Sequence, residues 1–278
     1  MRKKTALFLL STLVLAVTGR LAQAQIPPED VADRAKWEEF LRTAKVVAEE
    51  QLTGSGAVTN PWVLTLEKDG VTRRALWKNV SGRPKGFIDS WKCEIAAYEM
   101  DKLLGLNMIP PTVEARFREE PGSCMLWESP MTSLFDKTER KEAAPPGLKT
   151  VKWNMCVYLQ RAFDNLIANE DRHLRNVLIT NDWKMILIDH SRSFRSSKKF
   201  TKDLIYTERH REGPKLMSML PRAFVENIKA LSFERIKGAV GEYLTDDEIN
   251  AILIRQGLIL KEIDRLIKLN GEAQVLYD

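Results

Sequence analysis

The stretch that decides the fold is Asn169-Glu170-Asp171-Arg172-His173-Leu174-Arg175-Asn176, which is followed by two short apolar runs and by Asp189. Residues 177–180 and 185–188 have the composition of β-strands, and Asn181-Asp182-Trp183-Lys184 between them is typical of a turn. We therefore expect a β-hairpin whose centre lies in the middle of that turn, between Asp182 and Trp183.

Asn176 and Asp189 are equally far from this midpoint, so the two side chains are expected to face each other at the open end of the hairpin. Amide and carboxylate oxygens are ligands that suit Mg²⁺. Asp171 precedes Asn176 by five residues, where it is placed to orient a hydroxyl and accept its proton. Base, Asn ligand and Asp ligand follow one another in this order in phosphoryl-transfer sites.

Each of these three residues also has a simpler interpretation. Asp171 is then a helix-exit cap or a surface carboxylate, Asn176 a turn residue that starts a strand, and Asp189 a strand-end cap. The apolar run before Asp189 places its carboxylate at the edge of a core, where it needs a partner, and a cation would supply one.

Lys78 and Glu94 extend the candidate site. Lys78 lies in an apolar strand beside Leu76 and Trp77, and Glu94 falls in the first turn of a helix predicted over 90–104. We expect Lys78 to contact nucleotide phosphates and Glu94 to hold its ammonium group at the back of a cleft. The alternatives are an edge-strand lysine that opposes aggregation and a carboxylate favoured by the helix dipole.

The remaining candidates carry weaker patterns. His173 either packs structurally in the loop, which is the first interpretation, or stabilises charge on a transferring phosphate. Gly54 and Gly56 either cover a phosphate or end a helix and form a turn. The basic run at 192–199 is either a solvated loop or a groove for an acidic or phosphorylated substrate.

Residues 1–24 have the organisation of an export signal. Arg2-Lys3-Lys4 is followed by a short apolar run and by the small-x-small sequence Ala22-Gln23-Ala24, so we expect a mature chain that starts near Gln25. This signal predicts that the protein is periplasmic or secreted in a bacterium. No later stretch has the composition of a membrane span. The net charge of +5 is spread among acidic residues, which argues against a nucleic-acid partner.

The rest of the chain predicts a β-rich half followed by a helical half. We expect a leading helix within 25–50, an N-lobe over 51–131 and a C-lobe over 132–278. Strands are predicted at 62–66, 74–80, 112–117 and 123–127, an exposed loop at 195–215, and helices at 29–50, 90–104, 151–169, 221–231, 232–240 and 246–270. The three cysteines, Cys93, Cys124 and Cys156, show no zinc-ligand spacing and allow either one disulfide or buried thiols.

Two segments together resemble the atypical kinase superfamily: Asn169 to Asn176, and Leu187-Ile188-Asp189-His190-Ser191-Arg192-Ser193-Phe194. This superfamily includes phosphoinositide lipid kinases, HipA-like bacterial kinases and secretory-pathway kinases related to Golgi casein kinase. Supporting pieces follow in the expected order: Ala75-Leu76-Trp77-Lys78, Glu94-Ile95-Ala96-Ala97-Tyr98, Leu104-Gly105 and Ile109-Pro110-Pro111. The resemblance implies an α+β, protein-kinase-like fold with a small β-rich N-lobe and a larger helical C-lobe.

The resemblance also implies residue roles. Lys78 and Glu94 would form the nucleotide-positioning ion pair, Asp171 would be the catalytic Asp, and Asn176 and Asp189 would bind the metal. Met125-Leu126-Trp127-Glu128 would be the hinge, with Leu126 and Trp127 next to adenine. The chain departs from ordinary protein kinases because it lacks a G-x-G-x-x-G loop, an Asp-Phe-Gly and an Ala-Pro-Glu sequence.

These observations predict an exported kinase-like phosphotransferase that uses ATP and Mg²⁺, with Mn²⁺ as an alternative. Its acceptor would be a hydroxyl of a protein or a glycan, with a lipid ranked third. The competing hypothesis is a catalytically silent kinase-fold binding protein, because ATP is scarce outside the cytoplasm.

Overall fold

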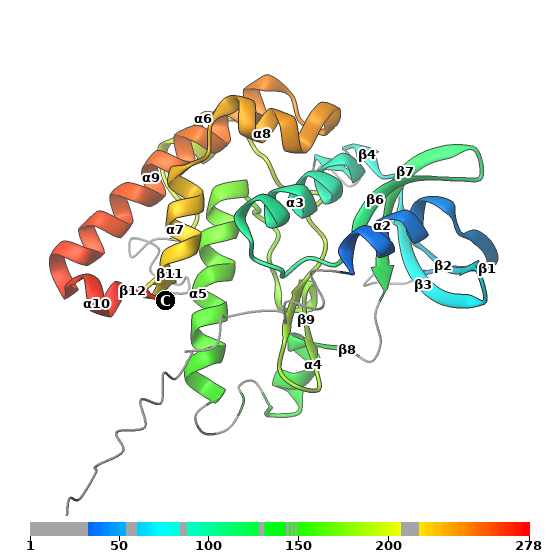
Figure 1. Cartoon of the computed structure of the whole chain (residues 1–278), viewed down its shortest axis with the longest axis horizontal. Coiled ribbons are helices and arrows are strands. Elements are labelled where there is room, and N and C mark those ends of the chain that lie inside the picture. Colours follow the sequence, from blue (N-terminus) through cyan, green and yellow to red (C-terminus); the bar gives the residue numbers. More distant parts are fainter. Residues whose placement is uncertain are drawn as a thin grey trace, which may run out of the picture.

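The structure is a computed structural model in which a β-sheet region leads and a helical region follows (Figure 1). It describes residues 33–53, 60–83, 88–127, 131–142, 145, 147, 149–206 and 217–278. The export signal at 1–24 and the pair Gly54 and Gly56 lie outside these residues, so both remain predictions. None of the described helices is long and apolar enough to cross a membrane.

The N-terminal region is built on one antiparallel five-stranded sheet with the strand order β1-β2-β3-β7-β6. The strands are β1 (Lys45–Gln51), β2 (Trp62–Lys68), β3 (Val71–Lys78), β6 (Thr112–Phe117) and β7 (Glu120–Trp127). Asp69 and Gly70 join β2 to β3 with positive φ values of 50° and 75°, as a tight hairpin turn requires. An Asp-Gly pair is a strong signal for such a turn, and the β2–β3 hairpin forms here.

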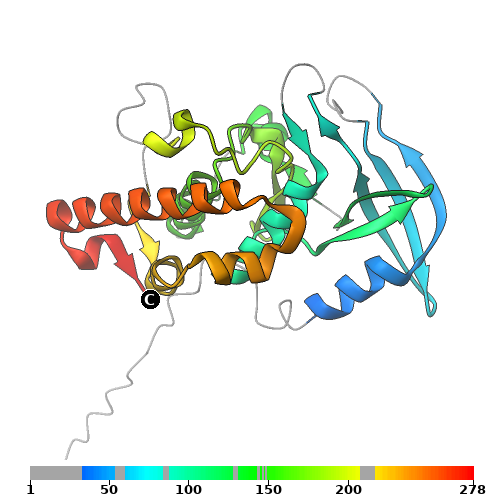
Figure 2. The ribbon, with the colours of Figure 1, turned by 90° about the horizontal axis from the view of Figure 1, so that it is seen from above.

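The predicted helix over 29–50 is wrong beyond Thr43. Helix α2 (Arg34–Thr43) stops at Ala44, whose backbone is extended, and β1 then pairs with β2. Phe40 and Leu41 of α2 are buried against the sheet, beside which the helix lies in Figure 2. The hydrogen bonds that β1 gains on β2, together with the β preference of adjacent valines, outweigh the helical spacing of its apolar residues.

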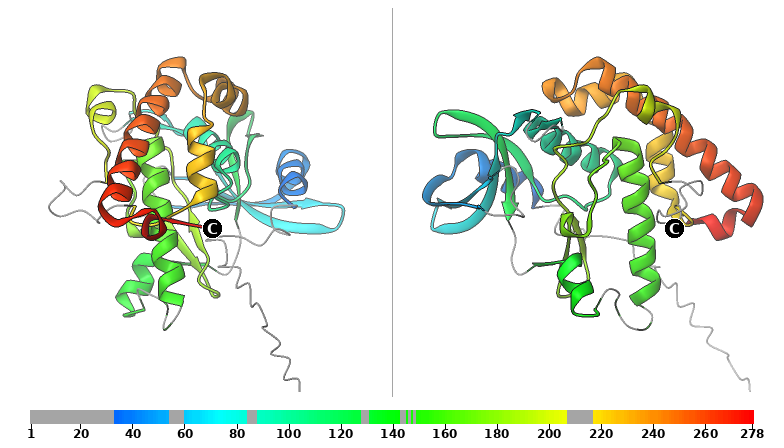
Figure 3. Two further views of the ribbon diagram at one scale, coloured as in Figure 1. Left: turned by 60° about the vertical axis from the view of Figure 1, so that its left-hand side comes forward. Right: turned by 180° about the vertical axis from the view of Figure 1, so that it is seen from behind.

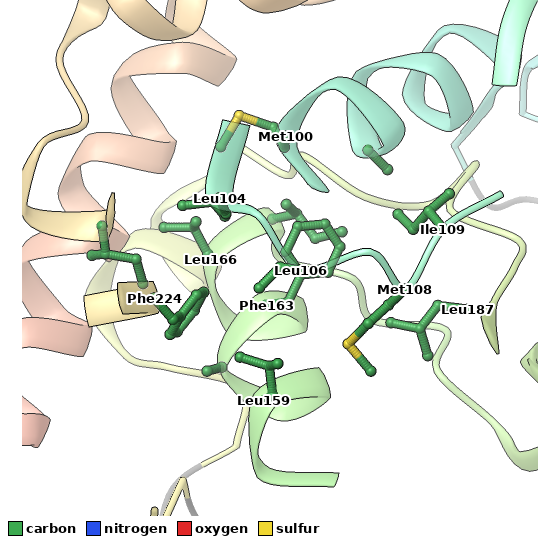
Figure 4. Close-up of a cluster of buried hydrophobic side chains, with 14 of the residues drawn as sticks. Met100, Leu104, Leu106, Met108, Ile109, Leu159, Phe163, Leu166, Leu187 and Phe224 are labelled. Carbon is green, nitrogen blue, oxygen red and sulfur yellow. The ribbon is translucent and has the colours of Figure 1, made fainter. Parts of the chain in front are cut away.

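The helical region is organised around α5, which lies between α9 and the small sheet β10-β9-β8 (Figure 3). The main helices are α3 (Trp91–Leu104), α5 (Lys149–Ile167), α7 (Arg222–Lys229), α8 (Phe233–Val240) and α9 (Asp246–Asn270). Figure 4 shows Met100 and Leu104 of α3 converging with Phe163 of α5 and Phe224 of α7. Helix α3 therefore joins the sheet to the main core.

Two local signals near the C-terminus have different outcomes. The sequence Thr245-Asp246-Asp247-Glu248 has the pattern of a capping box, and the box forms, because Thr245 caps the backbone of Glu248 and the Glu248 side chain bonds back to Thr245. The predicted exposed loop at 195–215 is wrong in its first part, where α6 (Lys198–Lys202) forms and Phe200 is buried. Burial of that ring against the core supplies the free energy that orders the segment.

The shorter elements complete the chain and carry the loops of the site. They are β4 (Ser81–Gly82), β5 (Asp89–Ser90), β8 (Met131–Ser133), α4 (Leu134–Glu139), η2 (Leu174–Asn176), β9 (Val177–Thr180), β10 (Met185–Leu187), β11 (Leu220–Pro221), η3 (Gly241–Tyr243), α10 (Glu272–Val275) and β12 (Leu276–Tyr277). All three cysteines are buried free thiols, so the disulfide alternative is not realised in this structure.

Candidate active site

The hairpin β9–β10 forms as predicted, but its register differs by one residue. Leu187 pairs with Val177, and the Ile188 amide donates to the Asn176 carbonyl at 3.1 Å. Asn176 therefore lies opposite Ile188 rather than Asp189. The reason is the turn, where Trp183 adopts a positive φ of 68° and shortens the loop to three residues.

Asp189 still reaches the site because the chain turns sharply after β10. Asp189 has a φ of 60°, a left-handed conformation that is uncommon for a residue with a side chain. Its carboxylate Oδ1 lies 2.8 Å from Nζ of Lys78, which is 111 residues earlier in the chain. Tertiary contacts therefore hold the backbone in this strained conformation.

Lys78 is the centre of a buried ion cluster. Its Nζ lies 2.8 Å from Oε1 of Glu94 as well as 2.8 Å from Asp189. Burial by itself lowers the pKa of Lys78, but the two carboxylates hold that pKa above its ordinary value. Burial alone would raise the pKa of Glu94, whereas Lys78 and His190 hold it well below its usual range. Lys78 and Glu94 are thus both charged at neutral pH.

A second buried network continues from Glu94 into the helical region. The His190 amide donates to Oε2 of Glu94 at 2.9 Å, and the His190 ring Nε2 lies 2.9 Å from Nη2 of Arg172. Arg172 in turn pairs with Asp164 of α5 at 3.0 Å. Burial lowers the pKa of His190, so the neutral ring accepts the hydrogen bond from Arg172 through Nε2.

Sequence reasoning missed the roles of His190 and Asp164. His190 lies in the Leu187-to-Phe194 segment that carries the resemblance but was given no role there, and Asp164 lies in no recognisable motif. Asp164 is fully buried within a helix of otherwise regular pattern. A carboxylate on the apolar side of a helix is the one signal that would have drawn attention to it.

Asp171 and Asn176 approach each other through the loop between α5 and β9. The Asn176 amide nitrogen Nδ2 donates to the Asp171 carbonyl at 3.0 Å, which makes Oδ1 of Asn176 the ligand atom that this side chain can offer. Partial burial raises the pKa of Asp171 above its ordinary value, although Arg192 opposes this shift. The side chain of Asp171 is 32% exposed and is therefore open to a substrate.

These residues surround one cavity of about 300 Å³. Its polar wall contains the side chains predicted to act on phosphate or on the acceptor: Lys78, Asp171, His173, Asn176 and Asp189. Its apolar wall is formed by Leu52, Pro61, Leu76, Trp127 and Ile188. A pocket lined by both apolar and charged side chains suits a molecule that carries an apolar ring and phosphates.

Two predicted residues stand apart from this cavity wall. Glu94 lies behind Lys78 and is 6% exposed. Leu126 is buried in the cluster on the opposite face of the sheet, with Phe40 and Trp77, so its side chain does not line the cavity. Its neighbour Trp127 does line it, because successive side chains of a strand point to opposite faces.

The charges fit a divalent cation held partly by its substrate. Around the cavity and its back wall, four carboxylates (Glu94, Asp89, Asp171 and Asp189) meet three cations, of which Lys78 and Arg192 pair with them and Arg175 also lines the cavity. The described residues contain no group of three or more His, Cys, Asp or Glu side chains that could hold a metal. Asn176 and Asp189 fit Mg²⁺, which commonly takes one or two protein ligands and completes its shell with phosphates and water.

Comparison with known proteins finds the fold in solved structures. Neither a protein-family model nor a curated protein sequence matches the chain. A structure of hydra Fam20 with sugar aligns with a TM-score of 0.65 and 15% identity over 92% of this chain and 95% of that one. The chain has the atypical-kinase fold.

The Golgi casein kinase aligns with a TM-score of 0.63 and 16% identity over 91% of this chain and 80% of that kinase. Its structure with Mn and ADP bound gives a TM-score of 0.64 and 14% identity over the same shares of the two chains. The α+β, kinase-like arrangement that the motifs predicted is therefore confirmed as a fold, with the β-sheet region first and the helical region second.

Proposed function

We propose that the chain is an exported phosphotransferase that moves the γ-phosphate of ATP to a hydroxyl group with the help of Mg²⁺ or Mn²⁺. The observation that carries this proposal is the bridge of Lys78 between Glu94 and Asp189 beside a cavity that Asp171 also lines. Any buried lysine needs carboxylate partners, so the position of this bridge on the cavity that Asp171 also lines is what supports the proposal. The similarity of the fold to the solved kinases described above supports the same proposed function.

Each proposed role follows from a contact. Lys78 uses two of its three N–H donors on carboxylates, and the third would bind a nucleotide phosphate. Asp171 would orient the acceptor hydroxyl and take its proton as the oxygen attacks phosphorus and the bond to ADP breaks. A cation held by Asn176 and Asp189 would neutralise phosphate charge. Trp127 would pack against the base of the nucleotide.

The acceptor is proposed to be a protein or a glycan hydroxyl. One similar structure, that of hydra Fam20, is described with sugar, and the other similar protein is named a casein kinase. A lipid acceptor ranks behind these. The alternative function, a catalytically silent kinase-fold binding protein, is favoured by the export signal predicted at 1–24, since an extracytoplasmic compartment holds little ATP.

Nucleotide binding to the mature protein, starting at Gln25, tests the proposal most directly. We expect calorimetry to detect ATP binding that strengthens when Mg²⁺ or Mn²⁺ is added, because the cation bridges the protein to the phosphates. Radiolabelled ATP should then transfer phosphate to a protein or glycan acceptor. The absence of nucleotide binding with either cation would refute the phosphotransferase, whereas binding without transfer to any acceptor would favour the silent protein.

A further inference from the structure

Arg192 joins segments that lie far apart in the sequence. Its Nε lies 3.1 and 3.3 Å from the two carboxylate oxygens of Asp89, and its Nη1 lies 3.1 Å from Oδ2 of Asp171. Asp89 belongs to β5, immediately before α3, whereas Asp171 precedes η2. One guanidinium therefore connects the β-sheet region to the carboxylate that we propose as the base.

The two ends of this bridge differ in burial. Asp89 is 1% exposed and also accepts a hydrogen bond of 2.7 Å from Oγ of Ser191. The backbone amide of Ser90 further ties β5 to the Ser191 carbonyl at 2.9 Å. Asp171, by contrast, has a partly exposed side chain on the cavity. Arg192 is thus anchored at its buried end and holds the carboxylate at its other end.

We propose that Arg192 is a positioning residue for phosphoryl transfer, which fixes the Asp171 carboxylate through Oδ2 so that Oδ1 faces the acceptor hydroxyl. The inference rests on the proposed function. Arginine suits this task because its planar fork binds two carboxylates in a fixed geometry. Lys78 is engaged with Glu94 and Asp189 and lies at another part of the wall.

Steady-state kinetics of the Arg192→Ala and Arg192→Lys variants test this role. A base misplaced by about 1 Å costs on the order of 100-fold in rate. We therefore expect Arg192→Ala to lower kcat about 100-fold while the KM for ATP changes less than about threefold. Lysine keeps the charge that Asp89 needs for folding but lacks the fork, so Arg192→Lys should fold and still lose about tenfold in kcat.

Chemical rescue separates positioning from a general effect on the fold. Millimolar methylguanidinium should restore part of the kcat of Arg192→Ala, because the removed group bordered the cavity. Arg222→Ala is the matched control, since Arg222 also bridges two carboxylates, those of Glu272 and Asp278, but does not line the cavity. This control should keep its kcat and should not respond to methylguanidinium.

Each outcome decides the question. A kcat that is unchanged in both Arg192 variants overturns the inference, and so does a higher KM for ATP at constant kcat, which would assign Arg192 to nucleotide binding. A loss of kcat that methylguanidinium does not restore, and that accompanies a lower Tm in both variants, makes the role structural. A wild-type protein that binds no nucleotide overturns the proposed function itself, and the inference with it.

Discussion

Replacing Lys78 with methionine should destabilise the fold strongly. The change keeps the length of the side chain and its apolar contacts in β3. It removes the only charged partner of the Glu94 carboxylate among the described ion pairs, because the nearby His190 ring is neutral. Glu94 is 7% exposed in its side chain, so it cannot be resolvated without opening the structure. Breaking a buried pair in this way costs about 3–5 kcal/mol.

Thermal unfolding followed by circular dichroism measures this cost. In a domain of this size, 1 kcal/mol corresponds to roughly 2–4 °C in Tm, so the Tm of Lys78→Met should fall by at least about 6 °C. Lys45→Met is the control, because Lys45 is exposed on the edge strand β1 and its loss should change stability by less than about 0.5 kcal/mol.

A double-mutant cycle with Glu94→Gln assigns the effect to the pair. Lys78→Met combined with Glu94→Gln leaves no buried unpaired charge at these two positions, so the double variant should be markedly more stable than the sum of the single changes implies. The reasoning is refuted if Lys78→Met costs less than about 1 kcal/mol, or if the two changes add within about 0.5 kcal/mol.

Three further predictions follow from the site and the core. Asp189→Asn should abolish most metal-dependent transfer, whereas Asp171→Asn should leave nucleotide and metal binding nearly intact and impair transfer to the acceptor; equal binding and equal transfer in both variants would contradict the assignment. Because Glu94 has a pKa below its usual value near 4.5, its stabilising effect is present above that pH and lost as the pH falls below it. The stability difference between wild type and Glu94→Gln should therefore shrink from pH 7 to pH 3 in urea titrations. Burial raises the pKa of the three thiols to about 11 or 12, so a thiol reagent at pH 8 should label them only after unfolding; rapid labelling of the native protein would show that the core opens readily.

Much of the candidate site could be predicted from local signals. The helix predicted over 90–104 carries Glu94 and ends before Gly105. Gly105 adopts the left-handed conformation that is typical of such a helix end. The spacing of Asp171, Asn176 and Asp189 predicted that these residues gather at the open end of a hairpin. All three line the same cavity. The roles of these residues in transfer remain proposals.

Other features could not be predicted, because they depend on residues distant in the chain. The sequence alone favoured a helix through residues 45–50, and only pairing with β2 makes this segment part of a strand. The predicted hairpin register was wrong by one residue, since the conformation of Trp183 sets the loop length. No role was predicted for His190 from the sequence, although this residue links Glu94 to Arg172.

The sequence by itself determined the order of the chemical groups and most of the helices and strands that carry them, because caps, turns and periodic apolar residues act over a few positions. The tertiary structure decided which charges meet. Lys78 contacts Asp189 across 111 residues, and Arg192 contacts Asp89 across 103 residues. Such contacts form only when the packing of α3 between the sheet and the helical core brings buried charges to partners that offset their lost hydration.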